Sequence, residues 1–101
     1  MKQNTPQVLV RGNLENPRAI AVHPEGGLMF WTDWGTSPKI ERAHLDGSNR
    51  VTIVDSRLGW PNGVAIDHAD NKLYWVDANT QAVEVRYHLY LSLSGKNKTL
   101  F

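Results

Sequence analysis

The 101-residue sequence contains no cysteine. Disulfide bonds, structural thiolate metal sites and cysteine nucleophiles are therefore excluded together. Histidine occurs four times, but never with the spacing of a metal-binding motif such as HExxH. We interpret each histidine as an exposed strand or turn residue, and we expect neither a metal site nor a cofactor. The four are His23, His44, His68 and His88.

The sequence also lacks an excess of charge of one sign and any long apolar run. Eleven basic residues against ten acidic residues give a net charge of +1, which argues against a dedicated surface for nucleic acid. No apolar run approaches the roughly 20 residues of a membrane-spanning helix. Residues 1–4 are not followed by the apolar core of a signal peptide. We expect no nucleic-acid partner and no membrane insertion by this segment, which is either intracellular or cut from a longer secreted chain.

One stretch of the sequence occurs twice, 44 residues apart. Each copy has an aromatic pair, a β-branched residue and an acid, which is typical of a strand that ends at a carboxylate. A period in the forties indicates propeller blades or solenoid units. The chain holds about 2.3 such units, whereas propellers close with roughly four to eight blades. The two copies are Phe30, Trp31, Thr32 and Asp33, and Tyr74, Trp75, Val76 and Asp77.

Apolar and alternating stretches between turn residues predict four antiparallel strands in each unit. Asp46 and Gly47 predict a type I′ turn between the third and fourth strands. A further strand is expected over residues 6–12, because these residues align with residues 50–56 at the same interval. In the first unit the strands cover residues 17–23, 28–34, 39–45 and 51–54.

These elements divide the chain into three parts. We interpret residues 1–16 as the outer strand of a preceding blade, residues 17–60 as a first blade, and residues 61–101 as a second blade with an atypical C-terminal hairpin. The expected fold is all-β, a partial propeller of two four-stranded antiparallel blades plus one extra outer strand. Unpaired strand edges and half-covered blade faces predict that the isolated segment is poorly soluble or forms oligomers.

Asp33 and Asp77 each follow a strand that is predicted to be buried. Such an acid could be a catalytic base or a metal ligand, but one acid per unit at a fixed offset is better explained as structure. Buried carboxylates must be paired. We therefore expect both to accept hydrogen bonds from N–H groups of the adjoining blade, and we expect no catalytic residue.

Four residues are candidates for a binding site. Trp34 follows the central strand, Trp60 precedes an inner strand, and Arg18 and Asn62 occupy one position in successive units. Equivalent positions of neighbouring blades lie side by side on one rim, so these residues predict an amphipathic patch that anchors protein partners. The alternative is that Trp60 caps blade packing and Asn62 makes a turn.

Three strings resemble the class B, or YWTD, repeats of the low-density lipoprotein receptor family, and within it most closely the propellers of the Wnt co-receptors. They are LMFWTDWG at residues 28–35, KIERAHLDGSN at 39–49 and WPNGVA at 60–65. The resemblance covers about residues 7–85. It implies a six-bladed extracellular β-propeller that binds protein ligands or packs on neighbouring EGF-like modules. It also implies that the acids of the motif tie blades together, and that the asparagine matching Asn62 receives a loop of the partner.

The sequence departs from the family pattern in places. His23 stands where the family has an acid, which Asp67 keeps in the second copy, and Phe30 replaces the usual tyrosine. Asn97 lies in a glycosylation sequon, which has meaning if the chain is secreted. Two other functions stay open: a lactonase-type propeller enzyme with a central calcium, which needs several convergent acid or amide oxygens, and an intracellular NHL-type interaction propeller.

Overall fold

The chain is built from β-strands. A computed structural model describes residues 5–86, 90–94 and 97–100, with the backbone alone from residue 86 onward. Within these ranges there are nine strands and no helix, so the described part has no helix that is long and apolar enough to cross a membrane. The strands are β1 (Pro17–His23), β2 (Leu28–Asp33), β3 (Lys39–His44), β4 (Val51–Val54), β5 (Pro61–Asp67), β6 (Lys72–Asp77), β7 (Ala82–Arg86), β8 (Tyr90–Ser94) and β9 (Asn97–Leu100).

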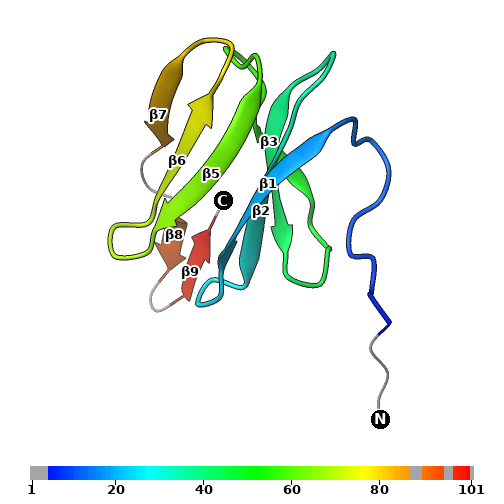
Figure 1. Cartoon of the computed structure of the whole chain (residues 1–101). Helices are drawn as coiled ribbons and strands as arrows, with labels where there is room; N and C mark the ends of the chain where they lie inside the picture. Colours follow the sequence, from blue (N-terminus) through cyan, green and yellow to red (C-terminus); the bar gives the residue numbers. More distant parts are fainter. Residues whose placement is uncertain (1–4, 87–89, 95–96, 101) are drawn as a thin grey trace.

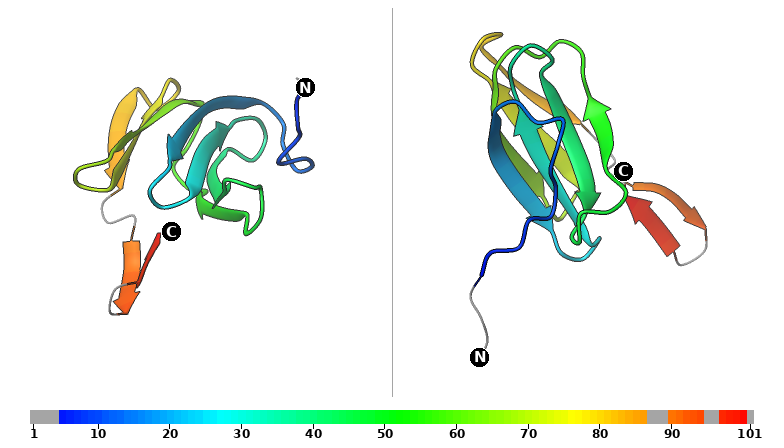
Figure 2. Two further views of the ribbon diagram at one scale, coloured as in Figure 1. Left: turned by 90° about the horizontal axis from the view of Figure 1, so that it is seen from below. Right: turned by 90° about the vertical axis from the view of Figure 1, so that its right-hand side faces the viewer.

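The strands form two larger sheets and a separate hairpin (Figure 1). The first sheet contains β1–β4 in chain order, the second contains β5–β7, and β8 pairs only with β9. All neighbouring strands are antiparallel. The first and second sheets pack face to face through a shared apolar cluster, and the hairpin projects away from both (Figure 2).

The second blade differs from the prediction of four strands. Its sheet ends at β7, and the last strand of the chain pairs with β8 instead of joining β7. In the first unit, the short turn around Gly47 returns the chain directly onto β3 as β4. The second unit has no counterpart of Asp46 and Gly47 in its sequence and carries four extra residues over 86–93, and its last two described strands pair with each other. The sequon residue Asn97 begins β9, where only the backbone is described.

The extra outer strand predicted over residues 6–12 is also not formed. Described residues of this segment pair with no strand, because the segment crosses a face of the first sheet instead of lying beside a strand edge. Val10 and Leu14 pack there on an apolar cluster that includes Trp31. We call residues 7–14 the N-terminal segment.

Arg50 holds the N-terminal segment against the sheet. Its Nη1 donates to the carbonyl oxygen of Gly12 at 2.8 Å, and its Nη2 donates to that of Asn13 at 3.1 Å. The same guanidinium pairs with Glu41, with Nη2 at 2.9 Å from Oε1. Because Glu41 is only 4% exposed, this pair is partly shielded from solvent, and breaking it is expected to release the segment.

The turn at Gly47 is not the predicted type I′ turn. Such a turn needs positive φ at both central residues, but Asp46 does not have it and Gly47 has φ of 90°. Instead the N–H of Gly47 donates to the carbonyl oxygen of His44 at 2.8 Å, which places Gly47 after the turn. Glycine is required at this position, since a Cβ there would collide with the backbone carbonyl of Leu9.

Packing repeats at the same interval as the sequence. Leu73 and Trp75 of the second sheet pack under Val54 and Leu58. Each of these residues has its counterpart 44 residues earlier, in the cluster where Val10 and Leu14 cover Met29 and Trp31. The cluster that contains Leu73 and Trp75 is completed by Leu28, Phe30 and Ile40 of the first sheet. The N-terminal segment is therefore the equivalent of the link between the two sheets.

His23 is buried, at 3% exposure, and the expectation that it is exposed was wrong. Its Nδ1 accepts a hydrogen bond from the N–H of Gly26 at 3.0 Å, so its Nε2 carries the proton and donates to Asn71 Oδ1 at 2.9 Å. In the second unit Asp67 accepts the equivalent bond from the N–H of Asp70 at 3.3 Å. The imidazole therefore takes the place that the acid Asp67 has in the second unit as an acceptor, and it adds a bond between the two sheets.

Candidate ligand-binding rim

Two buried aspartates position the candidate rim. Asp33 ends β2 and accepts hydrogen bonds from the N–H groups of Glu15 and Asn16, the latter at 2.6 Å. Asp77 ends β6 and accepts from the N–H groups of Gly59 at 2.7 Å and Trp60 at 3.0 Å. Each donor pair lies in the chain that enters the same sheet, and the two pairs are 44 residues apart. The prediction that backbone N–H groups satisfy these acids is confirmed.

The charge on Asp77 is stabilised where it lies. Burial alone raises the pKa of Asp77, but hydrogen bonds from the backbone N–H groups of Thr80, Gly59, Trp60 and Asn79 outweigh burial and keep the pKa below its ordinary value of 3.8. Asp77 is 2% exposed. The carboxylate thus fastens the loop after β6 to the chain that carries Trp60.

Trp34, Trp60 and Arg18 come together as predicted. The indole rings of Trp34 and Trp60 lie 6.3 Å apart between centroids and are tilted by 57°, which is a favourable aromatic contact. The guanidinium carbon of Arg18 lies 5.8 Å from the centroid of Trp34, within the range of a cation–π interaction. Trp60 keeps 48% of its surface exposed. We call Arg18, Trp34 and Trp60 the rim cluster.

Arg18 and Asn62 are both placed by β-bulges. The pairing of β1 with β2 shifts register between Pro17 and Ala19, and the pairing of β5 with β6 shifts at the equivalent place around Asn62. A bulge leaves one residue unpaired and redirects its side chain. Asn62 is exposed, but within residues 5–86 no hydrogen bond or ring contact joins it to the rim cluster. The sequence predicted the equivalence of the two positions but not the bulges.

Sequence reasoning missed Glu15, which orders the loop after Trp34. Its carboxylate accepts hydrogen bonds from Thr36 Oγ1 at 3.0 Å and from the N–H groups of Thr36 and Ser37. The side-chain bond from Thr36, followed by the two backbone bonds, lowers the pKa of Glu15. Gly35 fits here because a Cβ would collide with this carboxylate. The second unit has Gly59 in place of Glu15, so the repeat gave no signal for it.

Comparison with known proteins connects this geometry to a family. Residues 27–68 match the family model of the low-density lipoprotein receptor repeat class B. Over 78 residues the chain is 50% identical to human low-density lipoprotein receptor-related protein 5-like protein, and the match covers 77% of this chain and 31% of that protein. Over 72 residues it is 49% identical to the vitellogenin receptor Yl of Drosophila melanogaster, covering 71% of this chain and 4% of the receptor.

Solved structures agree with the sequence relatives. A chain in the crystal structure of a nidogen/laminin complex superimposes with a TM-score of 0.78 at 43% identity, over 80% of this chain and 31% of that chain. The present chain therefore spans about a third or less of the proteins it matches. It contains a class B (YWTD) repeat of the low-density lipoprotein receptor type, and its two larger sheets are arranged as consecutive blades of a β-propeller.

Proposed function

We propose that the chain is a non-catalytic protein-binding module of an extracellular receptor or matrix protein, and that its ligand contacts the rim cluster and Asn62. The observation that carries this proposal is the exposed half of Trp60, which lies in a tilted ring contact with Trp34, while Arg18 lies over the Trp34 ring. Tryptophan and arginine dominate binding hot spots, because they offer a large apolar area together with a polar group. The cluster stands on strand ends that Asp33 and Asp77 hold in place, so little ordering is needed when a ligand binds.

The acids of the repeat favour binding over hydrolysis. A lactonase-type calcium site needs acid oxygens that are free to converge on the ion. Both carboxylate oxygens of Asp33 and Asp77 already accept hydrogen bonds from backbone N–H groups. These residues therefore act as structural ties, and we propose no reaction for them.

The names of the relatives suggest which protein ligands to test. Two relatives are called vitellogenin receptors, and the structural match comes from a nidogen/laminin complex. We propose that the ligand of this chain is a protein that presents an amphipathic loop to the rim cluster. Such a loop would lay its apolar part on Trp60 and bring a carbonyl or carboxylate toward Arg18.

The proposed function predicts that Trp60→Ala weakens ligand binding at least about 30-fold, since hot-spot truncations cost about 2 kcal/mol or more. Arg18→Ala is expected to weaken binding about tenfold. The measurement is surface plasmon resonance of the chain against laminin and against vitellogenin, alongside thermal unfolding of each variant.

Matched controls come from exposed residues away from the rim. Leu45→Ala removes an apolar side chain and Arg11→Ala removes a guanidinium, both from exposed positions, and neither should change affinity. Equal affinity for Trp60→Ala and the parent chain would refute the site. If the parent chain binds neither protein, the proposed class of ligand is wrong.

A further inference from the structure

Two apolar sheet faces are partly exposed in the described part of the chain, and they are complementary. The first sheet turns Ile20, Val22, Met29 and Trp31 away from the second sheet, and we call these residues the Trp31 face. The second sheet turns Tyr74, Val76 and Val83 away from the first sheet, and we call these the Tyr74 face. Ile20 is 61% exposed, Tyr74 37% and Val83 72%. We propose that two copies of the chain associate head to tail, with the Tyr74 face of one copy on the Trp31 face of the next.

The chain already contains this contact once. Between its own sheets, Phe30 and Ile40 of the first pack on Val64, Leu73 and Trp75 of the second. At an interval of 44 residues Phe30 corresponds to Tyr74, and at 43 residues Ile40 corresponds to Val83. The residues of the second sheet on which Phe30 and Ile40 pack also have hydrophobic counterparts in the first sheet. Val64, Ile66, Leu73 and Trp75 correspond in that order to Ile20, Val22, Met29 and Trp31.

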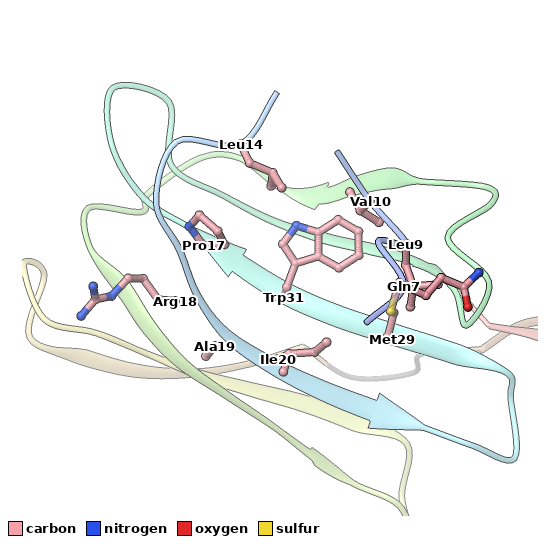
Figure 3. A pocket seen from close by; sticks show the side chains of 10 residues that line it. All are labelled: Gln7, Leu9, Val10, Leu14, Pro17, Arg18, Ala19, Ile20, Met29 and Trp31. Carbon is pink, nitrogen blue, oxygen red and sulfur yellow. The ribbon is translucent and has the colours of Figure 1, made fainter. Parts of the chain in front are cut away.

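The Trp31 face contains a cavity where the missing side chains would lie. It has a volume of about 430 Å³ and lies between the N-terminal segment and the sheet residues Ile20, Met29 and Trp31 (Figure 3). Val10 and Leu14 already cover one side of Trp31, as Val54 and Leu58 cover one side of Trp75. The cluster around Trp31 lacks counterparts of Phe30 and Ile40. Tyr74 and Val83 of a second copy would supply them.

The strand edges fit the same arrangement. Among the described strands none pairs with the outer edge of β7, which is the counterpart of the edge of β3 that pairs with β4. Residues 7–10 align with β4 at an interval of 44 and are unpaired in this chain. In β3 and β4, Glu41 faces Thr52, with Thr52 Oγ1 at 3.1 Å from Glu41 Oε2. The corresponding pair between two copies is Glu84 with Val8.

Such a contact joins different surfaces of the two copies. Heterologous contacts build closed rings or open filaments, depending on the rotation between copies. The N-terminal segment and β7 lie on opposite sides of the molecule (Figure 1), so one chain cannot make this contact with itself. The proposal concerns the 101-residue chain alone and does not depend on the rim cluster binding a ligand.

Cysteine cross-linking tests the arrangement, because the chain has no cysteine of its own. Chains carrying Val8→Cys are mixed with chains carrying Glu84→Cys under mild oxidation. We expect a disulfide-linked dimer of the two different chains, since facing strand residues bring their Cβ atoms within disulfide reach. The control pair is Val8→Cys with Ser37→Cys, at an exposed loop residue outside both faces. Equal cross-linking in the two mixtures would overturn the proposal.

Sedimentation measures the assembly without cysteine. We expect a mass that is a multiple of 11.4 kDa and that falls on dilution. Ile20→Arg on one face and Val83→Arg on the other should each raise the dissociation constant at least about tenfold, because each buries an unpaired charge in the contact. Ser37→Arg should leave it unchanged. A monomer at every concentration, or an oligomer that tolerates both face variants, would overturn the proposal.

Discussion

Replacing Phe30 by alanine is expected to lower the free energy of unfolding by about 3–5 kcal/mol, the usual cost of truncating a buried aromatic side chain. Phe30 is fully buried, at 0% exposure, in the cluster that joins the two sheets. The cavity left by this truncation would lie between the two sheets, which the hydrogen bond of His23 to Asn71 also joins. Chemical denaturation followed by tryptophan fluorescence measures the loss at a fixed protein concentration.

The control for this change is Leu45→Ala, at a turn residue that is 40% exposed and should change stability by less than about 0.5 kcal/mol. Phe30→Leu should recover part of the loss, because leucine refills some of the cavity. A loss below about 1.5 kcal/mol for Phe30→Ala would mean that the two sheets do not depend on this cluster, and the packing described here would be wrong.

The repeat made most of the fold predictable. Periodicity predicted the central strands and the burial of their tryptophans: Trp75 is buried between the two sheets, and its copy Trp31 is buried in the equivalent cluster under Val10 and Leu14. The aspartates were predictable for the same reason, since one acid per unit at a strand end must be paired inside the structure. The donors of Asp33 and Asp77 then proved equivalent at an interval of 44 residues.

The fourth strand of the second blade was not predictable. Strand pairing depends on which edge a segment meets, and the alignment of Thr99 and Leu100 with Thr52 and Ile53 of β4 says nothing about that edge. Residues 6–12 likewise match β4 in pattern but have no partner edge next to them. A strand forms only where its backbone can hydrogen-bond to a neighbouring strand. Equivalent residues therefore pair with β3 as β4 in the first unit, but cover a sheet face in the N-terminal segment.

At the rim, positions were predictable but local geometry was not. Trp34 and Trp60 were found because they flank predicted strands. Arg18 projects from a bulge, which depends on backbone details that residue types do not report. His23 was expected to be exposed because the histidines lack metal-binding spacing, yet its imidazole reproduces the acceptor of Asp67. Only the structure shows that an imidazole takes this role.

Replacing Asp77 by alanine is expected to destabilise the chain by about 3–5 kcal/mol, because several backbone N–H groups lose their acceptor at once and each buried unpaired donor costs about 1–3 kcal/mol. The N–H groups of Gly59, Trp60, Asn79 and Thr80 would all lose their acceptor. Asp77→Asn should cost less, about 2 kcal/mol, because its amide still offers one oxygen. The exposed Asp55 provides the control, and Asp55→Asn should change stability by less than about 0.5 kcal/mol.

The same carboxylate should make stability depend on acid pH. The folded-state pKa of Asp77 lies below its ordinary value of 3.8, so its contribution is fully present above the unfolded-state pKa and is lost as pH falls through the folded-state pKa. Unfolding free energies measured between pH 7 and pH 2 should therefore fall below about pH 4 in the parent chain, and less steeply in Asp77→Asn. The slope should not vanish, since the pKa values of Glu15 and Asp46 are lowered as well. Identical slopes for the parent and Asp77→Asn would show that the pKa of Asp77 is the same in the folded and the unfolded chain, so that the backbone N–H groups around Trp60 do not stabilise its charge.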